Sequence, residues 1–303
     1  MESIRARAES LGESLPGLLI EAERVAATVA QGIHGRRRVG MGETFWQYRP
    51  FEAHDAASSV DWRRSARSDA LYVRETEWEA AQSVWLWADG SASMDYASDR
   101  RLPRKTDRAR LLLLASAALL LRGGERVALM GVGERPAMGR AVLERLSDRL
   151  LGGAGAAPAA EGEAAGLPPS ERLPRGAQAL LFGDFLAPIE AVEERLGAFA
   201  AQQVRGAMIQ IMDPAEEALP FTGRTRFLGM ESEGDLTVGR AEALRARYVE
   251  RLTAHRDALG AAARAAGWRL LVHHTDQPPE QALLTLYMAL AHDSPHASGV
   301  GYG

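Results

Sequence analysis

The chain has 303 residues, and its 36 basic side chains (Lys and Arg) against 40 acidic ones leave a formal net charge of −4. This charge argues against a dedicated nucleic-acid-binding protein, because it provides no net positive field for a phosphate backbone. Its length allows a sizeable buried core, and its composition, 46% hydrophobic and 25% charged, excludes wholesale disorder. Cysteine is absent, which excludes disulfides, thiolate zinc sites and cysteine nucleophiles.

The apolar segments of the sequence are too short for a membrane span. The longest apolar run covers residues 111–121, which is well below the roughly 20 residues that a bilayer core requires. The first residues alternate charged and small side chains without an apolar stretch, which is not typical of a secretory signal. We therefore expect a cytoplasmic protein without a transmembrane segment.

Residues 1–80 predict an N-terminal accessory segment of mixed α and β structure. Apolar residues recur at helical spacing through the first 34 residues. Residues 40–51 are aromatic and punctuated by glycine, as in a pair of strands, and residues 58–68 favour a short polar helix. Residues 71–78 have the composition of a strand.

From about residue 81 the chain alternates short apolar strands with helices. Strands are predicted at 84–88, 127–132, 179–182, 207–212 and 268–273, and helices at 107–122, 141–150, 188–202, 240–266 and 280–291. This alternation is typical of a parallel sheet that is covered by helices on both faces. The predicted fold class is therefore α/β, with a doubly wound, mostly parallel sheet over residues 81–292.

Three stretches depart from the alternation. Residues 152–176 are rich in Gly, Ala and Pro without periodicity, which predicts a long mobile loop. Residues 225–238 predict a hairpin that turns near Glu233-Gly234-Asp235. The polar residues 293–303 predict a disordered tail.

The most distinctive chemical feature follows the first strand of the alternation, where the apolar residues 84–88 run directly into Asp89-x-Ser91-x-Ser93. In an open α/β sheet, ligands bind beyond the carboxyl ends of the strands, where neighbouring connections diverge. One carboxylate and two hydroxyls at that place are hard oxygen ligands, which suit an ion such as Mg²⁺. The alternative is a turn whose polar side chains only cap the next helix.

A second carboxylate supports the metal interpretation. Asp184 follows the apolar strand at 179–182, in the right order to neighbour the first strand. By itself Asp184 is equally well explained as a helix cap before Pro188. Together with Asp89, however, two carboxylates at adjacent strand ends favour a shared cation over uncompensated repulsion. The predicted metal ligands are Asp89, Ser91, Ser93 and Asp184.

This pattern resembles the metal-ion-dependent adhesion site of von Willebrand factor type A (vWA) domains. Upstream, Gly40–Phe45, Tyr48-Arg49, the stretch Asp61–Arg67 (Asp-Trp-Arg-Arg-Ser-Ala-Arg) and Glu77 look like the domain of unknown function 58 (DUF58) family. The likeness covers roughly residues 35–200. It implies a vWA-like fold, a bound Mg²⁺ or other divalent cation, and a role beside a MoxR-type AAA+ ATPase in chaperone-like maturation of other proteins, with no established catalytic activity.

The resemblance is incomplete at one ligand. The adhesion site normally takes a threonine hydroxyl from a loop between the first and fourth strands, but this chain has no threonine between Thr106 and Thr222. Ser147 and Ser170 are the possible substitutes, although neither lies in a convincing motif. A degenerate metal site therefore remains an alternative.

Other sequence features carry less information. The glycines at 152–155 lack the Lys-Ser/Thr of a phosphate-binding loop, so any ATPase activity is expected in a partner. His273 and His274 are adjacent on a strand and point to opposite faces, which favours a structural role over a zinc site. Lys105 is the only lysine of the chain, and we attribute this to an arginine-rich composition.

Three functions are consistent with these residues. The one we favour is a non-enzymatic protein-interaction module, in which a cation held by the predicted ligands accepts a carboxylate from an acidic partner or client. The second is a metal-dependent hydrolase with Asp184 or Asp95 as the general base. The third is a structural scaffold with an inactive site.

Overall fold

The computed structural model of the chain describes residues 18, 21–30, 45–52, 60–67, 70–76, 82–152, 165–230 and 234–292. By contact density the chain forms two compact units, one of residues 33–81 and one of residues 1–32 together with 82–303. The N-terminal residues, which the sequence grouped with the accessory segment, thus belong with the α/β unit. The reason is burial: residues 21–30 are helical, and Ala22, Val25, Ala26 and Val29 of this helix are buried.

The smaller unit contains an antiparallel strand pair. Strand β1 (Phe45–Pro50) pairs with β2 (Tyr72–Thr76), and the short helix α2 (Trp62–Ser65) lies between them in the chain. The strand pair predicted within residues 40–51 is therefore wrong for the described residues 45–51, because β1 takes its partner from β2. Residues 40–44 lie outside the described ranges.

Two residues of the segment Asp61–Arg67 have a structural role, because they form hydrogen bonds within the smaller unit. Asp61 Oδ1 accepts from the backbone N–H of Arg64 at 2.9 Å, which caps α2. Ser65 Oγ accepts from the backbone N–H of Tyr72 at 2.8 Å and so ties α2 to β2. One of the two arginines of this helix lies over an aromatic ring, with the guanidinium carbon of Arg64 5.5 Å from the centre of the Tyr72 ring.

The larger unit is built on a five-stranded parallel sheet with the strand order β4-β3-β5-β6-β9. Its strands are β3 (Ser83–Ala88), β4 (Arg126–Leu129), β5 (Gln178–Gly183), β6 (Arg205–Met212) and β9 (Arg269–His274). This arrangement confirms the predicted α/β class with a doubly wound, parallel sheet. The strand before Asp184 was expected to neighbour the strand before Asp89, and β5 does pair with β3, whose other neighbour is β4.

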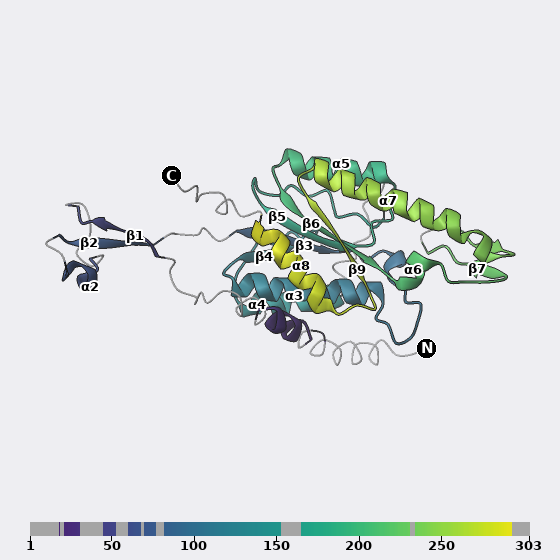
Figure 1. The fold of residues 1–303 in the computed structure, drawn as a ribbon, viewed down its shortest axis with the longest axis horizontal. Coiled ribbons are helices and arrows are strands. Elements are labelled where there is room, and N and C mark those ends of the chain that lie inside the picture. The colour runs from purple at the N-terminus through teal and green to yellow at the C-terminus, as the bar shows by residue number, and fades with distance from the viewer. Residues whose placement is uncertain are drawn as a thin grey trace. The chain divides into compact units, whose positions relative to one another are not determined.

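Helices cover both faces of this sheet (Figure 1). One face carries α3 (Lys105–Arg122), α4 (Arg140–Leu151) and α8 (Pro279–His292), and the other carries α5 (Ile189–Ala201) and α7 (Arg245–Ala265). Because successive strand residues point to opposite faces, β3 contributes to both cores.

Aromatic side chains dominate the core on the α5 and α7 side. Trp85 and Trp87 of β3 are each 6% exposed and belong to this core. The rings of Phe199 and Trp268 stack there with centroids 5.7 Å apart. Burial of this much apolar surface fixes the sheet against its helices.

The connections diverge between β3 and β5. The chain leaves β3 through α3 to reach β4 on one side, whereas it leaves β5 through α5 to reach β6 on the other side and over the opposite face. In this strand order, the point of divergence is where a crevice opens at the carboxyl ends of the strands. The carboxyl ends of β3 and β5 therefore mark the expected site.

The remaining elements refine the predicted boundaries. The predicted helix at 240–266 is a short 3₁₀ turn, η3 (Ala241–Ala243), followed by α7. The predicted hairpin is confirmed, since β7 (Thr225–Phe227) pairs antiparallel with β8 (Leu236–Val238). A short helix that the sequence analysis missed, α6 (Pro214–Ala218), follows β6.

Two further predictions concern loops and membrane segments. Of the predicted loop at 152–176, residues 153–164 lie outside the described ranges, as does the tail at 293–303. Residues 165–176 are described and contain no helix or strand. Among the residues that the structure describes, no helix combines the length and apolar character needed to cross a membrane.

Candidate functional site

Asp89 leaves β3 in a turn that its own side chain closes. Its backbone N–H donates to Phe182 O at 2.7 Å, which extends the pairing with β5, and the residue is only 3% exposed. Asp89 Oδ1 accepts from the backbone N–H of Ser91 at 2.8 Å. A 3₁₀ turn, η2 (Ala92–Met94), follows, so that Ser91 and Ser93 come to lie at the partly exposed rim above the buried carboxylate.

Asp184 leaves the neighbouring strand β5 and meets this turn. The residue is 1% exposed, and its Oδ2 accepts from Ser93 Oγ at 2.8 Å. Ser93 Oγ also lies 3.1 Å from Ser91 Oγ. The two hydroxyls therefore bridge the turn after β3 and the carboxylate after β5. The structure thus brings all four residues of the predicted metal site into one cluster.

The backbone after β5 is held in a strained conformation beside this cluster. Phe185 has a φ of 52°, in the left-handed region that a residue with a Cβ seldom adopts, and its carbonyl accepts from His255 Nε2 at 2.8 Å. Gln210 Nε2 donates to the carbonyl of Asp184 at 2.9 Å, and the N–H of Leu186 donates to Asp184 Oδ1 at 3.2 Å. These contacts fix the position of the Asp184 carboxylate.

Glycines leave room around Asp89. A Cβ on Gly183 would lie 2.9 Å from Asp89 Cβ, closer than real Cβ contacts allow, and a tight 3.3 Å from Asp89 Oδ2. Gly166, with a φ of +76°, approaches from the segment that leads to β5, and a Cβ there would lie 3.4 Å from Asp89 Oδ2 and 3.9 Å from Ser91 Oγ. The two glycines thus form a cradle that any side chain would partly fill.

The two possible substitutes for the threonine are Ser147 and Ser170. Ser147 is 2% exposed on α4, and Ser170 is exposed in the segment before β5. Gly166 of that segment lies beside Asp89, and glycine has no hydroxyl to offer.

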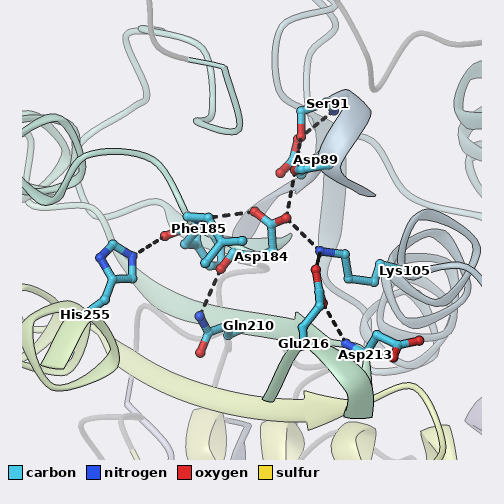
Figure 2. Close-up of polar contacts among 11 residues, drawn as sticks. Asp89, Ser91, Lys105, Asp184, Phe185, Gln210, Asp213, Glu216 and His255 are labelled. Carbon is cyan, nitrogen blue, oxygen red and sulfur yellow. Dashed lines mark hydrogen bonds and ion pairs between the residues drawn. The ribbon is translucent and has the colours of Figure 1, made fainter. Parts of the chain in front are cut away.

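A buried lysine forms an ion pair with the Asp184 carboxylate of the cluster. Lys105, at the start of α3, is 0% exposed, and its Nζ lies 2.9 Å from Asp184 Oδ2 and 2.6 Å from Glu216 Oε1 (Figure 2). Burial by itself lowers the pKa of Lys105, but the charges of Asp184 and Glu216 outweigh it, so that the pKa lies above its ordinary value. The side chain is therefore a permanent ammonium ion under the predicted metal ligands.

The second carboxylate on this ammonium comes from α6. Burial raises the pKa of Glu216, although its ion pair with Lys105 opposes the shift. Glu216 Oε2 accepts from the N–H of Asp213 at 2.9 Å, while Asp213 Oδ1 accepts from Ala215 N at 2.8 Å, so the two acids form a capping box at the start of α6. Asp213 Oδ2 also accepts from the N–H of Ser98 at 2.9 Å, which ties α6 to the loop before α3.

Sequence reasoning missed Lys105 and Glu216 as members of the site. A signal existed for each: Lys105 is the only lysine in the chain, and Asp213-Pro-Ala-Glu216 has the spacing of a capping box. The composition argument for Lys105 was wrong in one respect, because full burial between two carboxylates is a specific structural role. Neither signal, however, indicates that these residues meet Asp184.

The donor set fits a hard divalent cation. Across the described ranges, no cluster of three or more histidine, aspartate or glutamate side chains is arranged to hold a metal ion. The cluster offers two carboxylates and two hydroxyls, which are oxygen donors of the kind that Mg²⁺ accepts, and the glycine cradle leaves space beside Asp89. The ammonium of Lys105 on Asp184 is a competing positive charge.

These features define a class of protein: a doubly wound α/β fold with a polar oxygen cluster at its switch point. The profile of the family described as "Protein of unknown function DUF58" matches residues 47–258. The chain belongs to the DUF58 family. The DUF58 resemblance drawn from the upstream segments, of which Asp61–Arg67 is the most distinctive, is therefore confirmed.

Similar proteins include uncharacterised proteins of Mycobacterium bovis and Mycobacterium tuberculosis. Each is 27% identical over 257 residues, which cover 82% of this chain and 80% of the relative. Among solved structures, an aerotolerance-related membrane protein from Bacteroides fragilis with multiple mutations to serines superposes with a TM-score of 0.34 at 14% identity. The conserved hypothetical protein BatB from Bacteroides thetaiotaomicron gives 0.33 at 11% identity. Both superpositions cover 70% of this chain and 100% of the other.

Proposed function

We propose that the chain is a non-enzymatic protein-interaction module whose cluster at the β3–β5 switch point binds a carboxylate of another protein through a divalent cation such as Mg²⁺. In this proposal Asp89, Ser91, Ser93 and Asp184 hold the cation, and the partner's acidic side chain completes its coordination. The cation would supply the positive charge that makes an acidic side chain a specific ligand.

One observation carries this proposal. Two buried carboxylates from separate strands, Asp89 and Asp184, are linked through hydroxyls that remain partly exposed. Buried carboxylates at adjacent strand ends need positive charge nearby, of which Lys105 supplies one unit at Asp184. The partly exposed rim of Ser91 and Ser93 is the side from which a further cation and a partner can approach. The arrangement therefore supports a bridging cation that faces solvent.

The hydrolase alternative has less support. A general base must accept a proton from an attacking water, so its carboxylate should be available. Of the two candidates, Asp95 is ion-paired with Arg104, and Asp184 accepts from both Lys105 and Ser93. These contacts favour binding over catalysis.

The partner follows from the family resemblance. We propose that a MoxR-type AAA+ ATPase is one partner and that an acidic client protein is the other, with the pair acting in chaperone-like maturation of the client. ATP hydrolysis would then reside in the ATPase, and the encounter would take place in the cytoplasm, where ATP is available. No nucleic acid is part of the proposal.

A retention experiment tests this function. The tagged chain is used to retain the MoxR-type ATPase of the same organism, with Mg²⁺ or with EDTA, and Asp89→Asn is compared with Asp99→Asn. Asp99 is the matched control, because it is a carboxylate of the neighbouring loop that pairs with Arg101. We expect EDTA and Asp89→Asn each to reduce retention by at least about tenfold, since a cation-bridged charge pair is lost. Retention that is equal under all four conditions would remove the cation from the mechanism.

A further inference from the structure

The ammonium of Lys105 stands in an unusual relation to the proposed cation site. Lys105 is fully buried, and its Nζ shares Asp184 Oδ2 with Ser93 Oγ at distances of 2.9 and 2.8 Å. The same carboxylate oxygen thus already accepts from a positively charged donor. A divalent cation that uses Asp184 must compete with this charge.

From these contacts we infer that Lys105 is an internal gate on cation binding: its ammonium ion holds Asp184 in the resting site and must yield that carboxylate before Asp89 and Asp184 grip a divalent cation together. This inference rests on the proposed function, since it concerns the same site. Lys105 is a positioning residue here, because it acts through Asp184.

Glu216 makes such a gate physically possible. Its Oε1 lies 2.6 Å from Lys105 Nζ, and its Oε2 is fixed by the N–H of Asp213 at 2.9 Å. When Asp184 is taken by a cation, the ammonium keeps one anionic partner and is not left alone in the protein interior. The lysine can therefore move its charge toward α6 at a tolerable cost.

The surroundings of Asp184 favour a choice between two cations over sharing. The N–H of Leu186 donates to Asp184 Oδ1 at 3.2 Å and so holds the carboxylate, while Gln210 donates to the backbone carbonyl of Asp184 at 2.9 Å and holds the main chain. A fixed carboxylate cannot swing away from one cation toward the other. The positions of Lys105, Asp184 and Glu216 in a single hydrogen-bonded row are visible in Figure 2.

The first test uses the fact that Lys105 is the only lysine. With lysine carrying ¹⁵N at Nζ, the folded chain gives one side-chain ammonium signal, and Mg²⁺ alone is titrated into the wild-type protein. We expect the signal to shift with a saturable midpoint, and the shift to be abolished in Asp89→Asn. A signal that stays unchanged while Mg²⁺ binding is detected by calorimetry would overturn the inference.

The second test compares two variants that differ only in the ammonium group. Glu216→Gln keeps Lys105 on Asp184, whereas K105M/E216Q removes the ammonium without leaving a buried glutamate unpaired. Mn²⁺ binding is measured by electron paramagnetic resonance. We expect K105M/E216Q to bind Mn²⁺ at least about tenfold more tightly than E216Q, because a like charge is removed from the site. Equal or weaker binding in the double variant would refute the gate.

The two proposals fail in different ways. If wild type and K105M/E216Q bind Mn²⁺ equally and partner retention depends on Mg²⁺, the interaction function holds and the gate does not. If K105M/E216Q binds Mn²⁺ while wild type does not, Lys105 keeps cations out, and the cation-bridged function is wrong for the wild-type chain. If no variant binds Mn²⁺, both proposals are refuted.

Discussion

Two buried basic side chains on the first turn of α3 have different kinds of partners. Lys105 lies between the carboxylates of Asp184 and Glu216, whereas the hydrogen-bond partners of Arg108 are neutral. Arg108 donates to the carbonyls of Gln277 and Thr275 at 2.5 and 3.0 Å, and its Nη1 lies 2.9 Å from His273 Nε2. Both side chains are buried, at 0% and 8% exposure.

The partners explain the difference in charge behaviour. The negative charges of Asp184 and Glu216 more than offset burial and raise the pKa of Lys105, whereas burial dominates at Arg108 and lowers its pKa. Lys105 thus forms ion pairs at the switch point, whereas Arg108 donates hydrogen bonds to the backbone carbonyls that follow β9. Helix α3 therefore contacts both the site at β3 and β5 and the edge strand β9 of the sheet.

The largest expected effect is that of Lys105→Met on stability. This change leaves Asp184 and Glu216 without their buried counter-ion, so we expect the free energy of unfolding to fall by about 3–5 kcal/mol in a urea titration. K105M/E216Q should recover part of this loss, because one stranded carboxylate is removed. A loss no larger than that of an exposed-site substitution would contradict the ion-pair description.

Arg108→Met should cost less than Lys105→Met. Its partners are neutral carbonyls and a histidine, which lose hydrogen bonds but are not left as buried charges, so we expect about 2–3 kcal/mol. The same urea titration measures it. If Arg108→Met destabilises more than Lys105→Met, the distinction between the two buried cations is wrong.

Gly183→Ala should disturb the site more than the fold. The added Cβ would lie 2.9 Å from Asp89 Cβ, so we expect a loss of about 1–3 kcal/mol and weaker Mn²⁺ binding. Gly197→Ala is the control, because Gly197 lies on α5 with no atom within 4 Å of the added Cβ, and it should stabilise by about 0.5–1 kcal/mol. Mn²⁺ binding that is unaffected by Gly183→Ala would argue against the glycine cradle.

The smallest expected effect is a pH dependence at His273. Burial first, and then the charges of Arg108 and His274, lower its pKa from 6.5 to about 3. A depressed pKa means that the stabilisation is complete above the unfolded-state pKa and is lost as the pH falls from about 6.5 toward 3. The loss should be about 1 kcal/mol between pH 6.5 and pH 5.5.

The control for His273 is His273→Gln, which keeps an acceptor for Arg108 but does not titrate. Unfolding free energies of both proteins are compared across the same pH range, so that the carboxylates common to both cancel. The gap between the two curves should narrow as the pH falls. Parallel curves would show that His273 is protonated equally in the folded and unfolded states.

The elements near the site differ in how well they could be predicted. β3 and β5 were predicted within a residue or two, because apolar strands between turn residues have a strong signal in the sequence. The cluster of Asp89, Ser91, Ser93 and Asp184 was predicted as a group, since carboxyl ends of parallel strands share one edge of the sheet. The short helix α6 was missed, because its five residues are too few for a periodic pattern.

The α/β alternation, the family and the two strand ends that carry Asp89 and Asp184 could all be predicted from the sequence. Tertiary structure decided what surrounds them: residues 105 and 216 are distant along the chain, and only the packing of α3 and α6 at the carboxyl edge of the sheet brings their charges onto Asp184. It also decided that Gly166, from the segment before β5, lies beside Asp89. A local sequence pattern records hydrophobic period and turn chemistry, whereas the partner of a buried charge depends on long-range packing.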